Sequence, residues 1–308
     1  MQVLVTGASG AIGAELIPRL AAGGHRVRAF GRHPERIVAQ GVAEAVRGDA
    51  ISGDGLRRAL DGVDVAYFLI HSMETTVNGT GTFAERDRRA ADRFAAAAAD
   101  AGVRRIVYLG GLVPTNVAAS PHLASRLEVE RTLIDAAPEA VALRASIVIG
   151  ARSRSFRFLV RLVERVRVMP LPAWRIHRTA PIDARDVMAF LERAGASDAV
   201  DGRLSLDIAG PDVVTYAQLV ERIRDALLLG RPRLDLPLNL TPVASRVAAA
   251  IAGEDIGLVG PLMGSLTADL LPRDHRAPAL FGVRLHGLDA AIDRALRDWE
   301  SVEELAGR

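Results

Sequence analysis

Residues 3–20 read VLVTGASGAIGAELIPRL, in which an apolar run, a glycine-rich turn and an amphipathic pattern follow one another. The apolar run Val3–Val5 is typical of a buried parallel strand. Gly7, Gly10 and Gly13 then recur at every third residue. In such a turn the first glycine permits a tight bend, the second lets backbone approach a pyrophosphate, and the third lets the helix pack closely on the strand. This strand–turn–helix context predicts a dinucleotide-binding site.

The first turn of the helix after these glycines is expected to hold the phosphates. Its free N–H groups and the positive end of its dipole favour an anion, and the Ser9 hydroxyl adds a donor. We therefore expect the turn to contact the cofactor through Gly7, Ser9, Gly10, Ala11, Ile12 and Gly13.

The exit of the second expected strand favours NADP(H) over NAD(H). An NAD site usually places an acidic residue there to bond the ribose 2′-hydroxyl. Here the chain reads Gly31, Arg32, His33, with Arg36 one turn further on. A guanidinium can give a 2′-phosphate two parallel N–H bonds. The alternative is that Arg32 simply faces solvent.

Strand and helix patterns alternate from here to about residue 150. Strand patterns cover 42–50, 64–72, 104–112 and 140–150, and helix patterns cover 81–102 and 121–137. This rhythm predicts an α/β fold, a Rossmann-type doubly wound parallel sheet with a smaller, mostly helical C-terminal substrate lobe. We expect a dinucleotide-binding domain over 1–150 and a substrate or cap region over 151–308, with elements at about 174–210 returning to the main sheet.

Composition excludes several classes of protein. The basic residues other than histidine number 39 and all are arginine, so a net charge of only +2 yields a pI near 9.6 without a strong field. With 4% aromatic residues, nucleic-acid binding is not expected. There is no cysteine, no HExxH and no GxSxG, so no metal site or hydrolase elbow is expected. No apolar run is long enough for a membrane helix, and no signal peptide is evident before the first strand, so we expect the cytoplasm.

Several stretches resemble the atypical short-chain dehydrogenases/reductases, in particular the NAD(P)H-binding, NmrA-like group. These are TGASGAIG, GDA at 48–50, YFLIHSM, RDRRAADRFAAAAADAGVRRIVYLGGL, SPHLASRLEVE, LRASIVIG and APIDARDV, spread over about the first 190 residues. The resemblance implies an adenine site at Asp49 and Ala50, a ribose side at Leu69, Ile70 and His71, and a nicotinamide wall formed by Ser146, Ile147, Val148 and Ile149. The alternatives are a turn role for Asp49 and a core role for Leu69 and Ile70.

The family's catalytic residues are missing. Its reductases use a tyrosine as proton donor, a lysine that lowers the tyrosine's pKa, and a serine that orients the carbonyl. The chain has no lysine, the serine position is Gly110 or Gly111, and Tyr67, Tyr108 and Tyr216 fall in strands or at a late helix start. A Tyr-Lys pair is therefore ruled out.

Histidines are the candidates to replace that pair. His122 and Arg126 have the same four-residue spacing on one helix face, so His122 could donate a proton and Arg126 could bind the ribose. His71 and Ser72, at the end of a parallel strand, could donate to a substrate oxygen. The alternatives are an N-terminal helix residue without a catalytic task for His122 and a hydrated strand end for His71.

Two features of the C-terminal part complete the expectations. Residues 152–167 predict a helix with a basic face of Arg154, Arg157, Arg161 and Arg165, which could meet an anion but is more typical of a solvated surface. Asp183 is expected to cap a helix, with Asp186 in the capping-box position. Short apolar helices after Arg231 are expected to close over the cofactor.

The sequence thus predicts an NADP(H)-dependent oxidoreductase that reduces a small apolar substrate with a conjugated C=C bond, an iminium or an activated carbonyl. The alternative is a non-catalytic NADP(H)-binding redox sensor. A small-molecule substrate is the expected partner, and a homodimer is left open.

Overall fold

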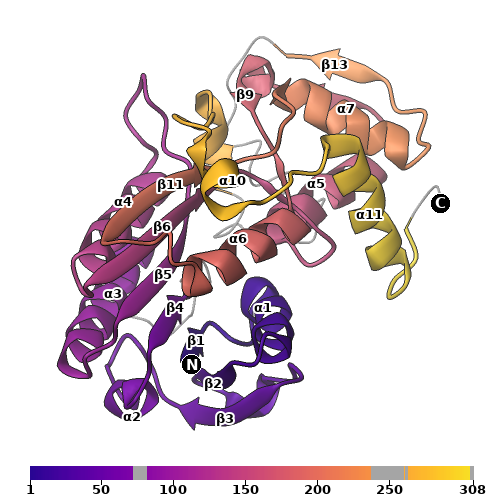
Figure 1. Ribbon diagram of the computed structural model, residues 1–308. Helices are drawn as coiled ribbons and strands as arrows, with labels where there is room; N and C mark the ends of the chain where they lie inside the picture. Colours follow the sequence, from indigo (N-terminus) through magenta and orange to yellow (C-terminus); the bar gives the residue numbers. More distant parts are fainter. Residues whose placement is uncertain (72–81, 237–259, 261–262, 306–308) are drawn as a thin grey trace.

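A parallel seven-stranded sheet forms the centre of the computed structural model, which describes residues 1–71, 82–236, 260 and 263–305 (Figure 1). Its strand order is β11-β6-β5-β4-β1-β2-β3. The strands are β1 (Gln2–Thr6), β2 (Arg26–Gly31), β3 (Val42–Arg47), β4 (Val65–Phe68), β5 (Arg105–Gly111), β6 (Glu139–Ala145) and β11 (Arg203–Ile208). The order reverses between β1 and β4, which confirms the Rossmann-type doubly wound fold.

Helices cover both faces of this sheet because alternate residues of each strand point to opposite sides. Val3 and Val5 pack in one apolar cluster with α1 (Ala11–Ala22), α6 (Ala184–Ala196) and α10 (Arg276–Phe281). Leu4 packs in the other, whose helices are α2 (Leu56–Leu60), α3 (Phe83–Asp100) and α4 (Pro121–Ile134). The central strands are therefore apolar on both faces, as a buried parallel sheet requires.

A separate apolar core lies beyond the sheet, in the C-terminal part of the chain (Figure 1). It joins α5 (Arg154–Arg165), α7 (Tyr216–Ala226) and α11 (Leu288–Glu300) around Trp299. The remaining elements are short: β7 (Val148–Ile149), β8 (Met169–Leu171), β9 (Arg178–Thr179), β10 (Ile182–Asp183), β12 (Val214–Thr215), β13 (Arg233–Asp235), and the 3-10 turns η1 (Pro34–Arg36), η2 (Ala173–Ile176) and η3 (Ser265–Thr267). Among the described residues no helix is both long and apolar enough to span a membrane. Much of the expected helical segment after Arg231, including 237–259, lies outside the described residues.

Local capping fixes where the helices begin and end. Thr82 and Glu85 form a capping box at the start of α3, and Gly102, at φ +69°, follows its last turn. Asp183 caps α6 as expected, since its carboxylate accepts from the N–H of Arg185 at 2.8 Å. Asp186 does not form the expected capping box. Its oxygens instead accept from the backbone N–H of His286 at 2.8 Å and lie 2.6 Å from that histidine's Nδ1.

The chain returns to the main sheet after α6, because β11 pairs in parallel with β6 at the sheet edge. A buried ion-pair network lies beside these two strands. Asp207 of β11 contacts Arg144 of β6 at 3.5 Å and accepts from Arg273 at 2.8–3.0 Å. Arg144 also pairs with Glu130 of α4. The network thus attaches the segment before α10 to the sheet edge.

Candidate active site

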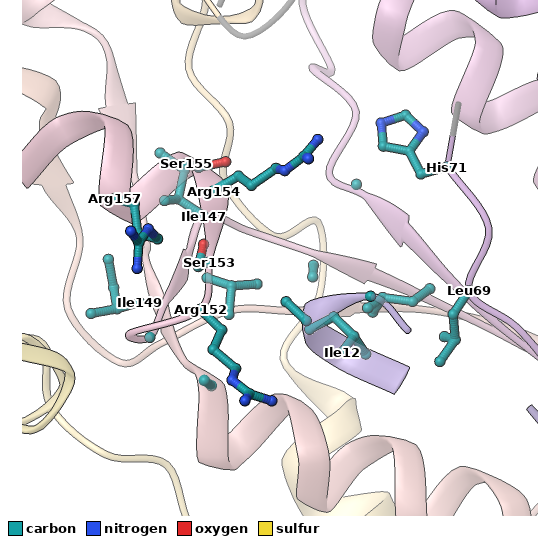
Figure 2. A pocket seen from close by; sticks show the side chains of 18 of the residues that line it. Ile12, Leu69, His71, Ile147, Ile149, Arg152, Ser153, Arg154, Ser155 and Arg157 are labelled. Carbon is teal, nitrogen blue, oxygen red and sulfur yellow. The ribbon is translucent and has the colours of Figure 1, made fainter. Parts of the chain in front are cut away.

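A large cavity opens at the carboxyl ends of the sheet strands, between the sheet and the C-terminal core (Figure 2). Its volume is about 1450 Å³. Every residue predicted to bind cofactor lines it: Gly7, Ser9, Gly10, Ala11, Ile12, Gly13, Arg32, Asp49, Ala50, Leu69, Ile70, His71, Arg126, Ser146, Ile147 and Val148. His122 lines it too, whereas Ser72 lies outside the described residues. The structure therefore brings together residues that are far apart in the sequence.

The glycine-rich turn is too crowded to accept a side chain at Gly7 or Gly13. Gly7 has φ +64°, and a Cβ there would lie 2.7 Å from the carbonyl oxygen of Leu69 at the end of β4. A Cβ on Gly13 would lie 2.5 Å from the Gly7 carbonyl oxygen. At Gly10 the nearest described atom is that same oxygen, at 3.1 Å. The turn therefore needs Gly7 and Gly13 for packing, while Gly10 leaves its outer side open to the cavity. This geometry fits a dinucleotide's phosphates.

The expected adenine end is formed by the loops after β2 and β3. Arg32 lines the cavity, and its side chain makes no hydrogen bond or ion pair to the described residues. The nearby acid Glu35 is occupied by His33 and Arg47, each at 3.1 Å. Asp49 has the turn role given above as an alternative, because one carboxylate oxygen accepts from the N–H of Ile51 at 2.8 Å. That bond is compatible with an adenine contact through the other oxygen.

Arg126 occupies the position of the family's lysine and is held in place from two sides. One guanidinium nitrogen donates to the carbonyl of Leu109, and the other lies 3.1 Å from Nδ1 of His71. The guanidinium carbon lies 5.1 Å from the ring centre of Tyr108. His71 Nδ1 is also 3.3 Å from the buried carboxylate of Asp87. Burial and Arg126 together lower the pKa of His71, although Asp87 opposes them.

His122, at the position of the family's tyrosine, is a neutral imidazole at neutral pH. Burial, His71 and Arg126 lower the pKa of His122 to about 3. Its ring lies 5.0 Å from the ring of His71, and its Nδ1 is buried with no hydrogen-bond partner among the described residues. A neutral imidazole offers a ligand a hydrogen bond but does not carry the acidic proton that the sequence argument assigned to it.

The far wall of the cavity contains residues that sequence reasoning did not assign to a site. Trp174, Tyr216 and Leu266 line it, and so does the stretch 151–155 before and within the first turn of α5. The alternating Arg-Ser pattern of this stretch was visible in the sequence, but the fold alone brings it opposite the glycine turn. The Ser146 hydroxyl is 3.2 Å from that of Thr179, which fixes its orientation at the cavity edge.

The basic face of α5 is not simply solvated, contrary to the expectation from its sequence. The guanidinium carbons of Arg157 and Arg161 lie 4.2 and 4.8 Å from the ring centre of Trp299 on α11. Both arginines also pair with Glu303. Half of this face therefore holds α5 against α11, and its first turn faces the cavity.

Comparisons with known proteins agree with this geometry. A family profile described as NAD(P)H-binding matches residues 7–148. The (4-alkanoyl-5-oxo-2,5-dihydrofuran-3-yl)methyl phosphate reductase of Streptomyces griseus is 32% identical over 232 residues, which is 75% of this chain and 74% of that protein. Among solved structures, UDP-glucose 4-epimerase of Thermus thermophilus in complex with NAD is similar at a TM-score of 0.73 and 19% identity, covering 98% of this chain and 100% of that one.

A short-chain dehydrogenase/reductase superfamily protein of Agrobacterium tumefaciens with bound NAD has a TM-score of 0.71 at 19% identity, covering 98% of this chain and 96% of that one. At 19% identity the two solved structures show only that the fold is shared. The reductase, at 32% identity, and the family profile show that this chain is related to them by common descent. The chain therefore belongs to the NAD(P)H-binding family of atypical short-chain dehydrogenases/reductases, as its sequence motifs predicted.

Proposed function

We propose that this chain is an NADP(H)-dependent reductase of a small, largely apolar substrate that carries a conjugated C=C bond, an iminium or an activated carbonyl. The observation that carries this proposal is the cavity. Its volume of about 1450 Å³ exceeds the roughly 300–1,000 Å³ of an ordinary ligand pocket. One end has the glycine turn and the other has apolar side chains of the C-terminal part. Such a cavity has room for a dinucleotide and a second molecule.

The choice of NADP(H) rests on the exit of β2. Arg32 lines the cavity where the ribose 2′ substituent of a dinucleotide is expected. The neighbouring acid Glu35 is paired with His33 and Arg47 and does not line the cavity. A free guanidinium without a competing carboxylate favours a 2′-phosphate over a 2′-hydroxyl.

The proposed chemistry needs little proton donation from the protein. A bound dihydronicotinamide supplies the hydride, and the chain's residues bind and orient the acceptor beside it. Reduction of a conjugated C=C bond places negative charge on the carbonyl oxygen, where Arg126 and neutral imidazole N–H groups can stabilise it. The proton can then come from water after hydride transfer. The name of the Streptomyces griseus relative supports this class of substrate, because a 5-oxo-2,5-dihydrofuran has a C=C bond conjugated with its carbonyl.

A second candidate is an NADP(H)-binding regulator without chemistry. The observation that favours it is the ionisation state of the histidines, whose pKa values are lowered, so that neither replaces the missing tyrosine as an acid. The apolar far wall favours the enzyme, because a sensor requires no substrate space.

Titration calorimetry with NADPH and NADH, followed by turnover with NADPH, tests the proposal. We expect tighter binding of NADPH, and Arg32→Ala should weaken NADPH by roughly 10-fold or more while barely changing NADH. Arg36→Ala is the matched control, since Arg36 is nearby but does not line the cavity. NADPH oxidation is then measured with unsaturated lactones, cyclic imines and activated ketones. Equal binding of the two cofactors contradicts the NADP(H) assignment, and no oxidation with any of the three classes favours the regulator.

A further inference from the structure

Two arginines project into the cavity from the start of α5. Arg152 precedes the helix and Arg154 is its first residue, with Ser153 between them as N-cap. Figure 2 shows Arg154 extending toward His71, and Arg152 extending on the side of Ile12. The segment thus reaches over the cavity from the wall opposite the glycine turn.

The position of these arginines is unfavourable for the helix itself. The N-terminus of an α-helix carries a partial positive charge that favours acidic side chains by about 0.3–1 kcal/mol each. The first turn of α5 has no acidic residue and begins with arginine. Arg152 makes no ion pair or hydrogen bond to the part of the chain that the structure describes. A sequence that opposes a local preference in this way often marks a functional site.

More positive charge lies on the same side of the cavity. Arg86 and Arg126 also line it, and Arg154 is close enough to His71 to lower the pKa of that histidine. Of the acids that line the cavity, Asp183 pairs with Arg185 and Asp298 with Arg294. Glu15 pairs with Arg19 and also lies near Arg152, since burial raises the pKa of Glu15 and both arginines oppose that rise. The Asp87 carboxylate is buried behind His71 and does not line the cavity. The region between α5 and His71 therefore favours an anion.

The wall next to these arginines is apolar. Phe158 and Leu159 of α5, together with Trp174, Leu219, Val220 and Leu266, line the cavity beyond the first turn of the helix. A ligand that reaches from Arg154 along this wall would place an anionic group at one end and a hydrocarbon body at the other.

We infer that the substrate is an amphipathic anion, in which a phosphate or carboxylate binds Arg154 at the start of α5, on the side that faces His71, and an apolar body packs along the adjoining wall. This inference rests on the proposed function and names its substrate class. The Arg154 guanidinium binds the oxyanion with charge-assisted hydrogen bonds, and the helix N-terminus adds its dipole.

Calorimetry on the protein saturated with NADP⁺ tests the inference without turnover. The probes are hexyl phosphate, heptanoate, hexanol and inorganic phosphate. We expect an alkyl anion to bind at least roughly 10-fold more tightly than hexanol, and Arg154→Gln to remove most of that difference. The stronger of hexyl phosphate and heptanoate identifies the anionic group. The matched control is Arg167→Gln, an exposed arginine outside the cavity, which should leave binding unchanged.

Several results would overturn the inference. If hexanol binds as tightly as both alkyl anions, there is no anion site. If inorganic phosphate binds as tightly as hexyl phosphate, the apolar wall contributes nothing to binding. If Arg154→Gln weakens the binding of NADP⁺ but leaves the binding of the alkyl anion unchanged, Arg154 belongs to the cofactor site. These outcomes are distinct from failure of the proposed function, which is absence of NADPH oxidation. An alkyl anion can still bind as predicted in a protein that turns over no acceptor.

Discussion

His122 illustrates how burial decides the role of a single side chain. Its pKa of about 3 means that the folded protein strongly prefers the neutral ring, whereas the ordinary value is 6.5. At neutral pH the His122 ring is neutral in both the folded and the unfolded chain, so its titration does not lower the free energy of unfolding. As the pH falls below about 6.5, the unfolded chain takes up a proton that the folded chain rejects, and stability falls by up to about 1.4 kcal/mol per pH unit.

We therefore expect His122→Phe, which keeps an aromatic ring but cannot titrate, to reduce the acid sensitivity of the fold. Between about pH 7 and about pH 5, wild type should lose roughly 1–2 kcal/mol more of its free energy of unfolding than the variant loses. Urea unfolding at both pH values measures this. His275→Phe, at an exposed histidine, serves as the control. An equal loss in wild type and His122→Phe would mean that His122 is not held neutral by the fold.

Sequence reasoning identified residues that the fold brings together around one cavity, but not their ionisation states. Glycine spacing and strand ends identify Gly7, Arg32 and His71 because parallel strands deliver their carboxyl ends to one edge. The neutral state of His122 depends on burial and on His71, which lies 51 positions earlier in the chain. The fixed position of Arg126 depends on the carbonyl of Leu109. Such contacts between distant segments leave no periodic signal in a sequence.

At the scale of elements, the turn between β1 and α1 is the most tightly specified. We expect Gly13→Ala to destabilise the fold by about 1–3 kcal/mol, because its Cβ would lie 2.5 Å from the Gly7 carbonyl oxygen and something must shift. Cofactor affinity should fall as well, since the same shift displaces the phosphate-binding turn. Thermal unfolding and NADPH titration measure the two effects.

Gly230→Ala is the control for that substitution, since no described atom lies within 4 Å of its built Cβ. It should change stability by less than about 0.5 kcal/mol. If Gly13→Ala behaves like Gly230→Ala, the close packing at Gly13 is not needed for the fold.

The helix α5 shows why a sequence does not predict which partners the polar face of a helix will contact. Its buried face is apolar, since Phe156, Val160 and Val163 are all buried. The sequence pattern suggested that its arginines face solvent, because their partners Trp299 and Glu303 are about 140 residues away in the chain. Arginine stems pack on aromatic rings as readily as they extend into water, so the sequence pattern does not distinguish the two.

At the scale of the whole molecule, the network around Asp207 connects β6, β11 and the segment before α10. We expect Asp207→Ala to lower the free energy of unfolding by about 2–4 kcal/mol, because Arg273 loses its buried partner and Arg144 keeps only Glu130. Asp135→Ala removes the exposed pair with Arg203, also on β11, and should cost less than about 1 kcal/mol. Denaturant titration compares the two, and similar costs would contradict a structural role for the network.

In the function proposed here, one cavity holds a dinucleotide and leaves substrate space beside its reactive ring. The measurement that tests this most directly is a crystal structure with NADP⁺ bound. We predict the pyrophosphate at Gly10–Ile12, the 2′-phosphate at Arg32, and the nicotinamide C4 facing open space between His71 and Arg154. A nicotinamide ring covered by side chains, with no space beside C4 for a second molecule, would contradict the claim and leave an NADP(H)-binding regulator.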